Sequence, residues 1–286
     1  MNRAWYKIAG ITICLETPFE VSDSDGFVLY RYEPAANEEP DTLAVWEPCE
    51  SFPEPAGEVL FRDMLHQVYE RETNGYRHFF SIPFDREFAA WTDLNGESKK
   101  IRMYYNPAKE GYFCQSFACF NALGIERILY GQKKFLFHCS YVEYQGKAIL
   151  FSAPSGGGKT TQGTLWEKYV PEAVMVNGDR AVLEVCDGQV ICHGLPIAGS
   201  SGVFLNRSMP LAGIFVVKKA GVNRVTPRVG MEAFQSVYSE LTLNMWNQDF
   251  VGDALDFADA VIEAVPVYTL ECTISEEAVS AVKEVL

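Results

Sequence analysis

Residues 148–161 read AILFSAPSGGGKTT, and this segment restricts the fold of the 286-residue chain more than any other. It opens with a short apolar run, which is typical of a buried strand in a parallel sheet. Three successive glycines follow, and Lys159 and Thr160 then begin a pattern with helical spacing. A strand, a glycine-rich loop and a helix in this order form the usual setting of a phosphate-binding loop. The segment therefore predicts an α/β fold that binds a nucleotide.

The residue types of this loop suit phosphate binding. Glycines lack a Cβ atom, so the backbone can bring several N–H groups close to phosphate oxygens. The following helix adds its positive N-terminal end. We expect Lys159 to contact the β- and γ-phosphates of ATP and the Thr160 hydroxyl to ligate Mg²⁺. The expected phosphate-binding residues are Pro154, Ser155, Gly156, Gly157, Gly158, Lys159, Thr160 and Thr161.

Ala153 occupies the first position of the motif G-x-x-x-x-G-K-[ST], where glycine is usual. Alanine is a small change, so we expect the turn to persist. A chance glycine-rich turn is the alternative interpretation. A Lys-Thr pair directly after three glycines and before a helix favours nucleotide binding.

The charge and cysteine content exclude several classes of protein. A net charge of −14 argues against nucleic acid or an anionic membrane surface as a partner. The eight cysteines contain no C-x-x-C pair, which favours reduced thiols over a zinc site. The first residues lack the apolar core of a signal peptide, and no stretch is long and apolar enough to span a bilayer. We expect a cytoplasmic protein.

Two domains are expected, a smaller, β-rich, mixed α+β domain over residues 1–130 and the phosphate-loop domain over residues 131–286. In the first, residues 33–58 are acidic and rich in proline, which predicts loops and short edge strands. His66 and His78 lie in ordinary core and surface patterns and are interpreted as structural. Strands are expected over 6–14, 26–32, 77–82 and 100–105, a helix over 61–70, and mixed structure closing with a helix over 111–130.

The second domain alternates between short β patterns and helical patterns. Asp187-Gly188 between two apolar runs is a strong hairpin signal. The helix after Lys159 should end before Pro171. Strands are expected over 135–144, 147–152, 173–176, 181–185, 189–193, 213–217 and 267–272, and helices over 234–245, 254–264 and the C-terminus.

Asp179 is the candidate acidic partner of the phosphate loop. It ends the apolar strand that follows the phosphate-loop helix, where a metal-binding carboxylate is expected. Asn-Gly-Asp is also a common turn sequence, so a plain turn is the alternative.

Residues 138–160, HCSYVEYQGKAILFSAPSGGGKT, resemble the core of HPr kinase/phosphorylase and related HPr-kinase-like proteins. Residues 155–161 also resemble the kinase loop of ATP-dependent phosphoenolpyruvate carboxykinase, which shares that fold. The resemblance covers about half the chain, roughly residues 136–286. It implies a P-loop core with a mixed sheet and flanking helices, and phosphoryl transfer from ATP to a hydroxyl group. Known acceptors in the group are a serine of a carrier protein, a serine of a lasso-peptide precursor, and free serine.

The resemblance also implies roles for individual residues. His138 stands where HPr kinases have a histidine close to the active site, and Thr160 and Asp179 would attend the metal. These families carry two adjacent aspartates where this chain has Gly178-Asp179. Either Asp179 accepts the hydroxyl proton while Mg²⁺ relies on Thr160, or His138 helps to take the proton. Arg180 could neutralise charge on the γ-phosphoryl group or be a surface turn residue.

Two functions follow. The first is an ATP- and Mg²⁺-dependent kinase in which Lys159 holds the phosphates and Asp179, with His138, receives the proton of a hydroxyl-bearing acceptor. This acceptor is a peptide, a carrier protein or a small molecule, and the first domain would select it. The second is a nucleotide-binding module without transfer activity, which the missing second aspartate favours. HPr kinases assemble as hexamers, so the resemblance leaves a homo-oligomer open.

Overall fold

The computed structural model describes residues 1–24, 26–71, 75–85, 87–94 and 99–286. The chain divides into two compact units. Unit 1 consists of Met1–Gln132 with Asn244–Gln248, and unit 2 of Lys133–Leu243 with Asp249–Leu286. Each unit holds one mixed β-sheet with several helices.

Unit 1 contains an eight-stranded sheet in the order β1-β2-β3-β8-β7-β6-β5-β4. Strand β3 is parallel to both of its neighbours, and every other pair is antiparallel. The strands are β1 Asn2–Ile8, β2 Ile11–Thr17, β3 Thr42–Pro48, β4 Val59–Arg62, β5 His66–Glu70, β6 Tyr76–Ser81, β7 Phe88–Leu94 and β8 Lys100–Tyr105. The predicted strands over 77–82 and 100–105 are thereby confirmed.

The helices of unit 1 are short. They are η1 Phe27–Tyr30, η2 Pro107–Lys109, α1 Glu110–Phe113, α2 Ser116–Leu123 and α3 Ile125–Tyr130. Aromatic rings join these helices to the sheet, and the buried ring of Phe120 stacks on Phe27 at 4.8 Å between centroids and meets Tyr6 edge-on at 5.1 Å. Such ring contacts add to the burial of apolar surface.

Two predictions for short apolar runs in unit 1 were wrong. In place of the expected strand over 26–32, Phe27–Tyr30 form a 3₁₀ helix, in which Phe27 and Tyr30, three residues apart, are both buried. Residues 61–70 form part of the β4–β5 hairpin instead of a helix. Its turn is held by the Asp63 carboxylate, which accepts hydrogen bonds from the N–H groups of Leu65 and His66 at 2.8 and 2.6 Å.

Two further strands differ from expectation. Residues 6–14 are not one strand, because the chain reverses at Ala9-Gly10, both with positive φ, and β1 pairs with β2. Strand β3 arises inside the proline-rich segment but lies within the sheet rather than at its edge. Its central apolar run, Ala44 to Trp46, is buried between β2 and β8.

His66 and His78 face each other on neighbouring strands of unit 1. Their rings stack with centroids 5.1 Å apart, and His66 Nδ1 lies 2.9 Å from His78 Nε2. Burial lowers the pKa of His66, an effect that Asp63 and Glu126 oppose and Arg127 reinforces. Burial also lowers the pKa of His78 well below its ordinary value, and the charges of Arg127 and His66 act in the same direction.

Unit 1 is therefore expected to lose stability in mild acid. The unfolded chain takes up protons on both rings near pH 6.5, whereas the folded chain resists doing so, and stability falls as the pH drops below that value. We expect the thermal unfolding midpoint to fall between pH 7.5 and 5.5, and His78→Phe to reduce that fall. An equal fall in both proteins would contradict this account. The readout is the difference between the two proteins in how steeply the unfolding midpoint falls with pH. The fall of the wild type alone is not enough, because burial also lowers the pKa of His193 in unit 2.

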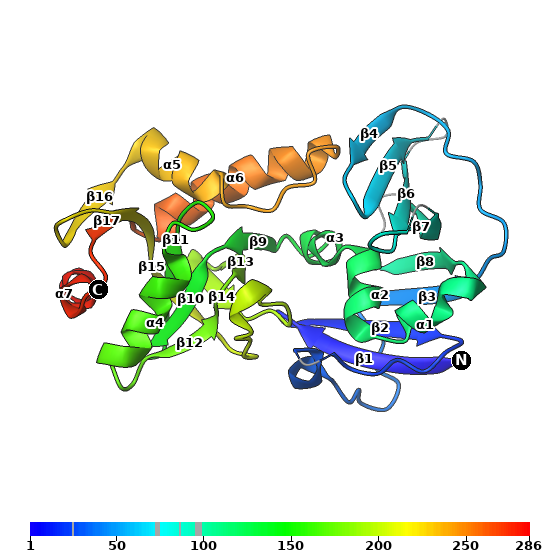
Figure 1. Cartoon of the computed structure of the whole chain (residues 1–286), viewed down its shortest axis with the longest axis horizontal. Helices are drawn as coiled ribbons and strands as arrows, with labels where there is room; N and C mark the ends of the chain where they lie inside the picture. Colours follow the sequence, from blue (N-terminus) through cyan, green and yellow to red (C-terminus); the bar gives the residue numbers. More distant parts are fainter. Residues whose placement is uncertain (25, 72–74, 86, 95–98) are drawn as a thin grey trace. The chain divides into compact units, whose positions relative to one another are not determined.

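Unit 2 contains a nine-stranded sheet in which β12, β10, β11, β15, β14, β13 and β9 are successive neighbours. Strand β15 also pairs with β17, which pairs with β16. Strand β15 is parallel to β11 and β17, and the other pairs are antiparallel (Figure 1). The strands are β9 Phe135–His138, β10 Ser140–Tyr144, β11 Lys147–Ser152, β12 Val174–Asn177, β13 Arg180–Cys186, β14 Gln189–His193, β15 Ser208–Lys219, β16 Arg224–Arg228 and β17 Val267–Cys272.

Helix α4 (Lys159–Tyr169) packs beside β10, β11 and β12, and α7 (Glu276–Lys283) packs on α4 (Figure 1). Trp166 of α4 is fully buried in the core that they share with the sheet. The remaining helices are η3 Gly199–Ser201, α5 Gly230–Tyr238 and α6 Gln248–Ala264. The predicted helix after Lys159, the β13–β14 hairpin and the strands over 147–152 and 267–272 are confirmed.

Two predicted elements of unit 2 are shorter than expected. The expected strand over 135–144 is broken at Cys139, so that β9 and β10 pair with different neighbours. The expected helix over 234–245 ends at Tyr238. The chain then runs beside β9, where the N–H groups of His138 and Thr242 donate to the carbonyls of Glu240 and Leu136, each at 2.9 Å.

Across the described ranges, the helices are all too short or too polar to cross a membrane.

Candidate functional site

The glycine loop, residues 153–158, joins the end of β11 to the first residue of α4. Gly156 and Gly158 have φ values of +72° and +107°, a region that L-residues with side chains rarely adopt. A Cβ atom on Gly157 would lie 2.6 Å from the Ala153 Cβ and 2.7 Å from the Pro154 carbonyl oxygen. The loop therefore needs its glycines, and Ala153 at the first position is accommodated.

Lys159 is buried, with 8% of its surface exposed, although it carries a charge. Its Nζ donates a hydrogen bond to the Ala153 carbonyl oxygen at 2.7 Å, so the ammonium group is folded back over the glycine loop. A buried cation normally has an anionic partner. Here a bound phosphate could supply it.

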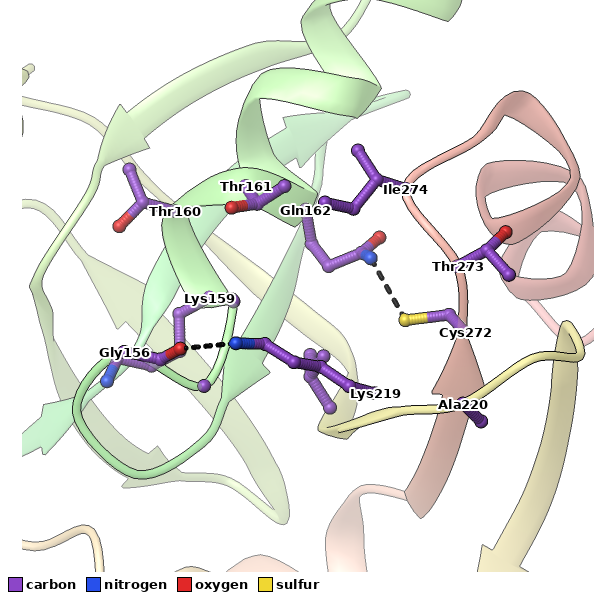
Figure 2. Close-up of a pocket in the computed structure, with 13 residues that line it drawn as sticks. Gly156, Lys159, Thr160, Thr161, Gln162, Lys219, Ala220, Cys272, Thr273 and Ile274 are labelled. Carbon is purple, nitrogen blue, oxygen red and sulfur yellow. Dashed lines mark hydrogen bonds between the residues drawn. The ribbon is translucent and has the colours of Figure 1, made fainter.

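A pocket of about 450 Å³ lies beside the glycine loop. Residues 156–162 line one side, and Figure 2 shows the ends of β15 and β17 opposite them. The second wall is formed by Val217, Lys219, Ala220, Cys272, Thr273 and Ile274. The pocket therefore combines the glycine loop and two lysines with the apolar side chains of Val217, Ala220 and Ile274, a combination suited to a ligand that has a charged and an uncharged half.

Gln162 lines this pocket but was not predicted. It is 2% exposed, and its Nε2 donates to the Cys272 Sγ at 3.1 Å (Figure 2). Its Oε1 is buried and has no hydrogen-bond partner among the described residues. Buried amide oxygens are normally satisfied, so this unpaired acceptor in a pocket-lining side chain is an exception. Nothing in the local sequence distinguishes Gln162 from a surface residue of α4.

Thr160 connects the pocket to Asp179. Its Oγ1 donates to the Gly178 carbonyl oxygen at 3.2 Å, so the first turn of α4 meets the turn at residues 177–180. Gly178 has no room for a side chain because a Cβ atom would collide with Ser201. A second carboxylate at this position would therefore not fit beside Ser201.

Asn177 fixes the turn that carries Asp179. Its Oδ1 accepts hydrogen bonds from the N–H groups of Asp179 and Arg180, both at 2.9 Å. Its Nδ2 donates to the carbonyls of Leu195 and Ile197 at 3.1 and 2.9 Å. A buried side-chain amide with all four of these bonds holds the backbone of the turn in one geometry.

His138 lies between two carboxylates. Its Nε2 is 3.4 Å from Asp179 Oδ1, and its Nδ1 is 3.3 Å from Glu240 Oε2. Arg180 Nε is 3.4 Å from the other oxygen of Asp179. Glu240 was not predicted, because only the pairing of residues 240–242 with β9 brings it to His138.

Thr160 and Asp179 are the two residues that could hold a Mg²⁺ ion beside a nucleotide. Thr160 supplies a hydroxyl oxygen and Asp179 a carboxylate, on elements that touch. Mg²⁺ in phosphate sites commonly takes only one or two protein ligands, with phosphate and water oxygens completing its shell. No group of three or more His, Cys, Asp or Glu side chains suited to a metal occurs in the described part of the chain.

The other predicted residues are distributed around this centre. Gly156, Gly157, Gly158, Lys159, Thr160 and Thr161 line the pocket, whereas Pro154 and Ser155 belong to the glycine loop without lining it. His193, which was not predicted as a site residue, has Nε2 3.1 Å from Glu184 Oε2 and Nδ1 2.8 Å from Ser208 Oγ. We therefore assign His193 a structural role.

No family model matches this chain, and no curated protein matches it. Among solved structures, it is similar to the HPr(Ser) kinase/phosphatase from Coxiella burnetii, with 9% sequence identity over 52% of this chain and 94% of that one. The TM-score is 0.30.

Proposed function

We propose that this chain binds MgATP and transfers the γ-phosphoryl group to a hydroxyl group, in the manner of HPr-kinase-like proteins. The observation that carries the proposal is the buried Lys159 ammonium, which lies over the glycine loop beside a 450 Å³ pocket. A cation and a helix N-terminus at one end of a partly apolar pocket suit a nucleoside triphosphate better than a neutral ligand.

In this proposal the N–H groups of the glycine loop and Lys159 hold the polyphosphate. Bound Mg²⁺, ligated by Thr160 and Asp179, would neutralise charge on the phosphate oxygens. The uncharged half of the nucleotide would occupy the part of the pocket between Gln162 and Ile274. The buried, unpaired Oε1 of Gln162 would then turn toward the pocket and accept a hydrogen bond from the base or the ribose.

Transfer requires a group that takes the acceptor proton. As the acceptor oxygen bonds to the γ-phosphorus, the bond to the bridging oxygen breaks, ADP leaves, and the hydroxyl proton passes to Asp179. His138 orients the Asp179 carboxylate, and Glu240 in turn orients His138 through Nδ1. Arg180 contributes positive charge beside the same carboxylate. Serine, free or in a peptide or carrier protein, is the acceptor that we propose.

A second candidate is a nucleotide-binding module without transfer activity. One observation favours it: Asp179 is the single carboxylate on its turn, and both of its oxygens already face His138 or Arg180. In the kinase, Asp179 alone would have to ligate Mg²⁺ and also take the proton of the acceptor.

Calorimetric titration of the whole chain with MgATP tests the shared part of both candidates. We expect saturable binding in the micromolar range, because a phosphate loop of this composition supplies several charge-assisted hydrogen bonds. Titration with adenosine under the same conditions should give much weaker binding. If MgATP does not bind, or binds no better than adenosine, the loop is not a phosphate site and both candidates fail.

A further inference from the structure

Lys219 reaches the glycine loop from a distant part of the chain. Strand β15 runs parallel to β11, with Val216 opposite Ser152, the last residue of β11. Parallel strands end at the same edge of a sheet. Because β15 continues three residues beyond this register, Lys219 arrives beside the loop, and its Nζ donates to the Gly156 carbonyl at 2.9 Å (Figure 2).

Its neighbour Lys218 points to the opposite face, as alternation along a strand requires. Lys218 Nζ pairs with Glu271 Oε1 at 3.1 Å on β17, and Arg224 pairs with the same carboxylate. These two partners, Arg224 first, lower the pKa of Glu271. For Lys219, the described residues offer no carboxylate within 4.0 Å, so its charge is not neutralised by an ion pair.

The two lysines of the pocket are held in the same way. Lys159 donates to the Ala153 carbonyl and Lys219 to the Gly156 carbonyl, both within the glycine loop. A carbonyl carries only a partial negative charge, so phosphate oxygens are the stronger partner for either ammonium group. In a chain with a net charge of −14, these lysines supply the local positive charge that a polyphosphate needs.

We propose that Lys219 is a second phosphate-binding residue that makes the pocket selective for nucleoside di- and triphosphates over monophosphates. This inference rests on the proposed nucleotide binding. Lys159 is the first residue of α4, whereas Lys219 is the last residue of β15, on the second wall of the pocket. A ligand with two or three phosphates spans both cations, whereas AMP, which lacks the β- and γ-phosphates, does not reach Lys219.

Competition against a fluorescent ATP analogue tests the proposal with MgATP, MgADP and AMP. We expect Lys219→Met, which keeps an unbranched apolar side chain, to weaken MgATP binding about tenfold, as expected for the loss of a hydrogen bond to a charged group. AMP affinity should change less than about twofold. Lys218→Met is the matched control, one residue away on the other face, and should leave all three affinities unchanged. Lys219→Arg should restore most of the MgATP affinity.

The outcomes separate this inference from the proposed function. If the wild-type chain binds no MgATP, nucleotide binding itself fails. If the wild type and Lys219→Met bind MgATP with equal affinity, nucleotide binding stands and only the proposed role of Lys219 is overturned. Equal weakening of MgATP and AMP would also overturn it, because the effect would then come from the pocket wall and not from the additional phosphates.

Discussion

Replacing Lys159 with alanine is expected to weaken MgATP binding about a hundredfold or more. The side chain is 8% exposed, and its ammonium group lies over the glycine loop, where its charge is little screened by water. Its removal takes away a charge-assisted contact with the β- and γ-phosphates and leaves the rest of the loop in place. Calorimetric titration with MgATP measures the change directly.

Lys168→Ala is the matched control for this variant. Lys168 lies in the last turn of the same helix, is exposed, and bonds to the hydroxyl of the neighbouring Tyr169. The Lys168→Ala protein should bind MgATP with the affinity of the wild type. Thermal unfolding of Lys159→Ala should be recorded as well, because the Ala153 carbonyl loses its partner. A folded Lys159→Ala protein with undiminished affinity would show that the phosphates bind elsewhere.

Asp179→Asn is expected to lower phosphoryl transfer about a thousandfold, within the range for loss of a general base. Asparagine keeps the size of the side chain but cannot take the acceptor proton. MgATP affinity should change only severalfold, because the loop and Lys159 remain. Production of ADP from MgATP, with free serine or water as the probe acceptor, provides the measurement.

The control for this substitution is Asp187→Asn. Asp187 is exposed in the β13–β14 turn, where its φ of +50° suits asparagine equally well. Full turnover by Asp179→Asn would remove Asp179 from the mechanism. If the wild-type chain binds MgATP but transfers the phosphoryl group to no acceptor, the second candidate, a nucleotide-binding module without transfer activity, is the function that remains. In that case Asp179→Asn should change metal affinity alone.

Elements set by neighbouring residues were predictable from the sequence. Strand β11, the glycine loop and α4 follow one another within 23 residues, and each is specified locally: an apolar run, glycines, and a helix that ends before Pro171. The β13–β14 hairpin follows from Asp187-Gly188, because both residues adopt the positive φ that such turns need.

Short apolar runs were not predictable in the same way. Residues 61–70 carry apolar side chains at a spacing that fits a helix, yet Asp63 bonds to the backbone two and three residues ahead and starts a hairpin. The pairing of β5 with β6 then completes the strand. Periodicity over so few residues does not distinguish a helix from a strand, so pairing with the neighbouring strands determines which one forms.

The sequence by itself determined the glycine loop, the lysine that follows it and the position of Asp179 after the next strand, because these depend on local backbone chemistry. Only the tertiary structure placed Glu240 against His138 and Lys219 beside Gly156. These contacts join residues 102 and 63 positions apart, respectively. They exist because strand pairing brings distant segments to one edge of the sheet, and no local pattern records which segments will pair.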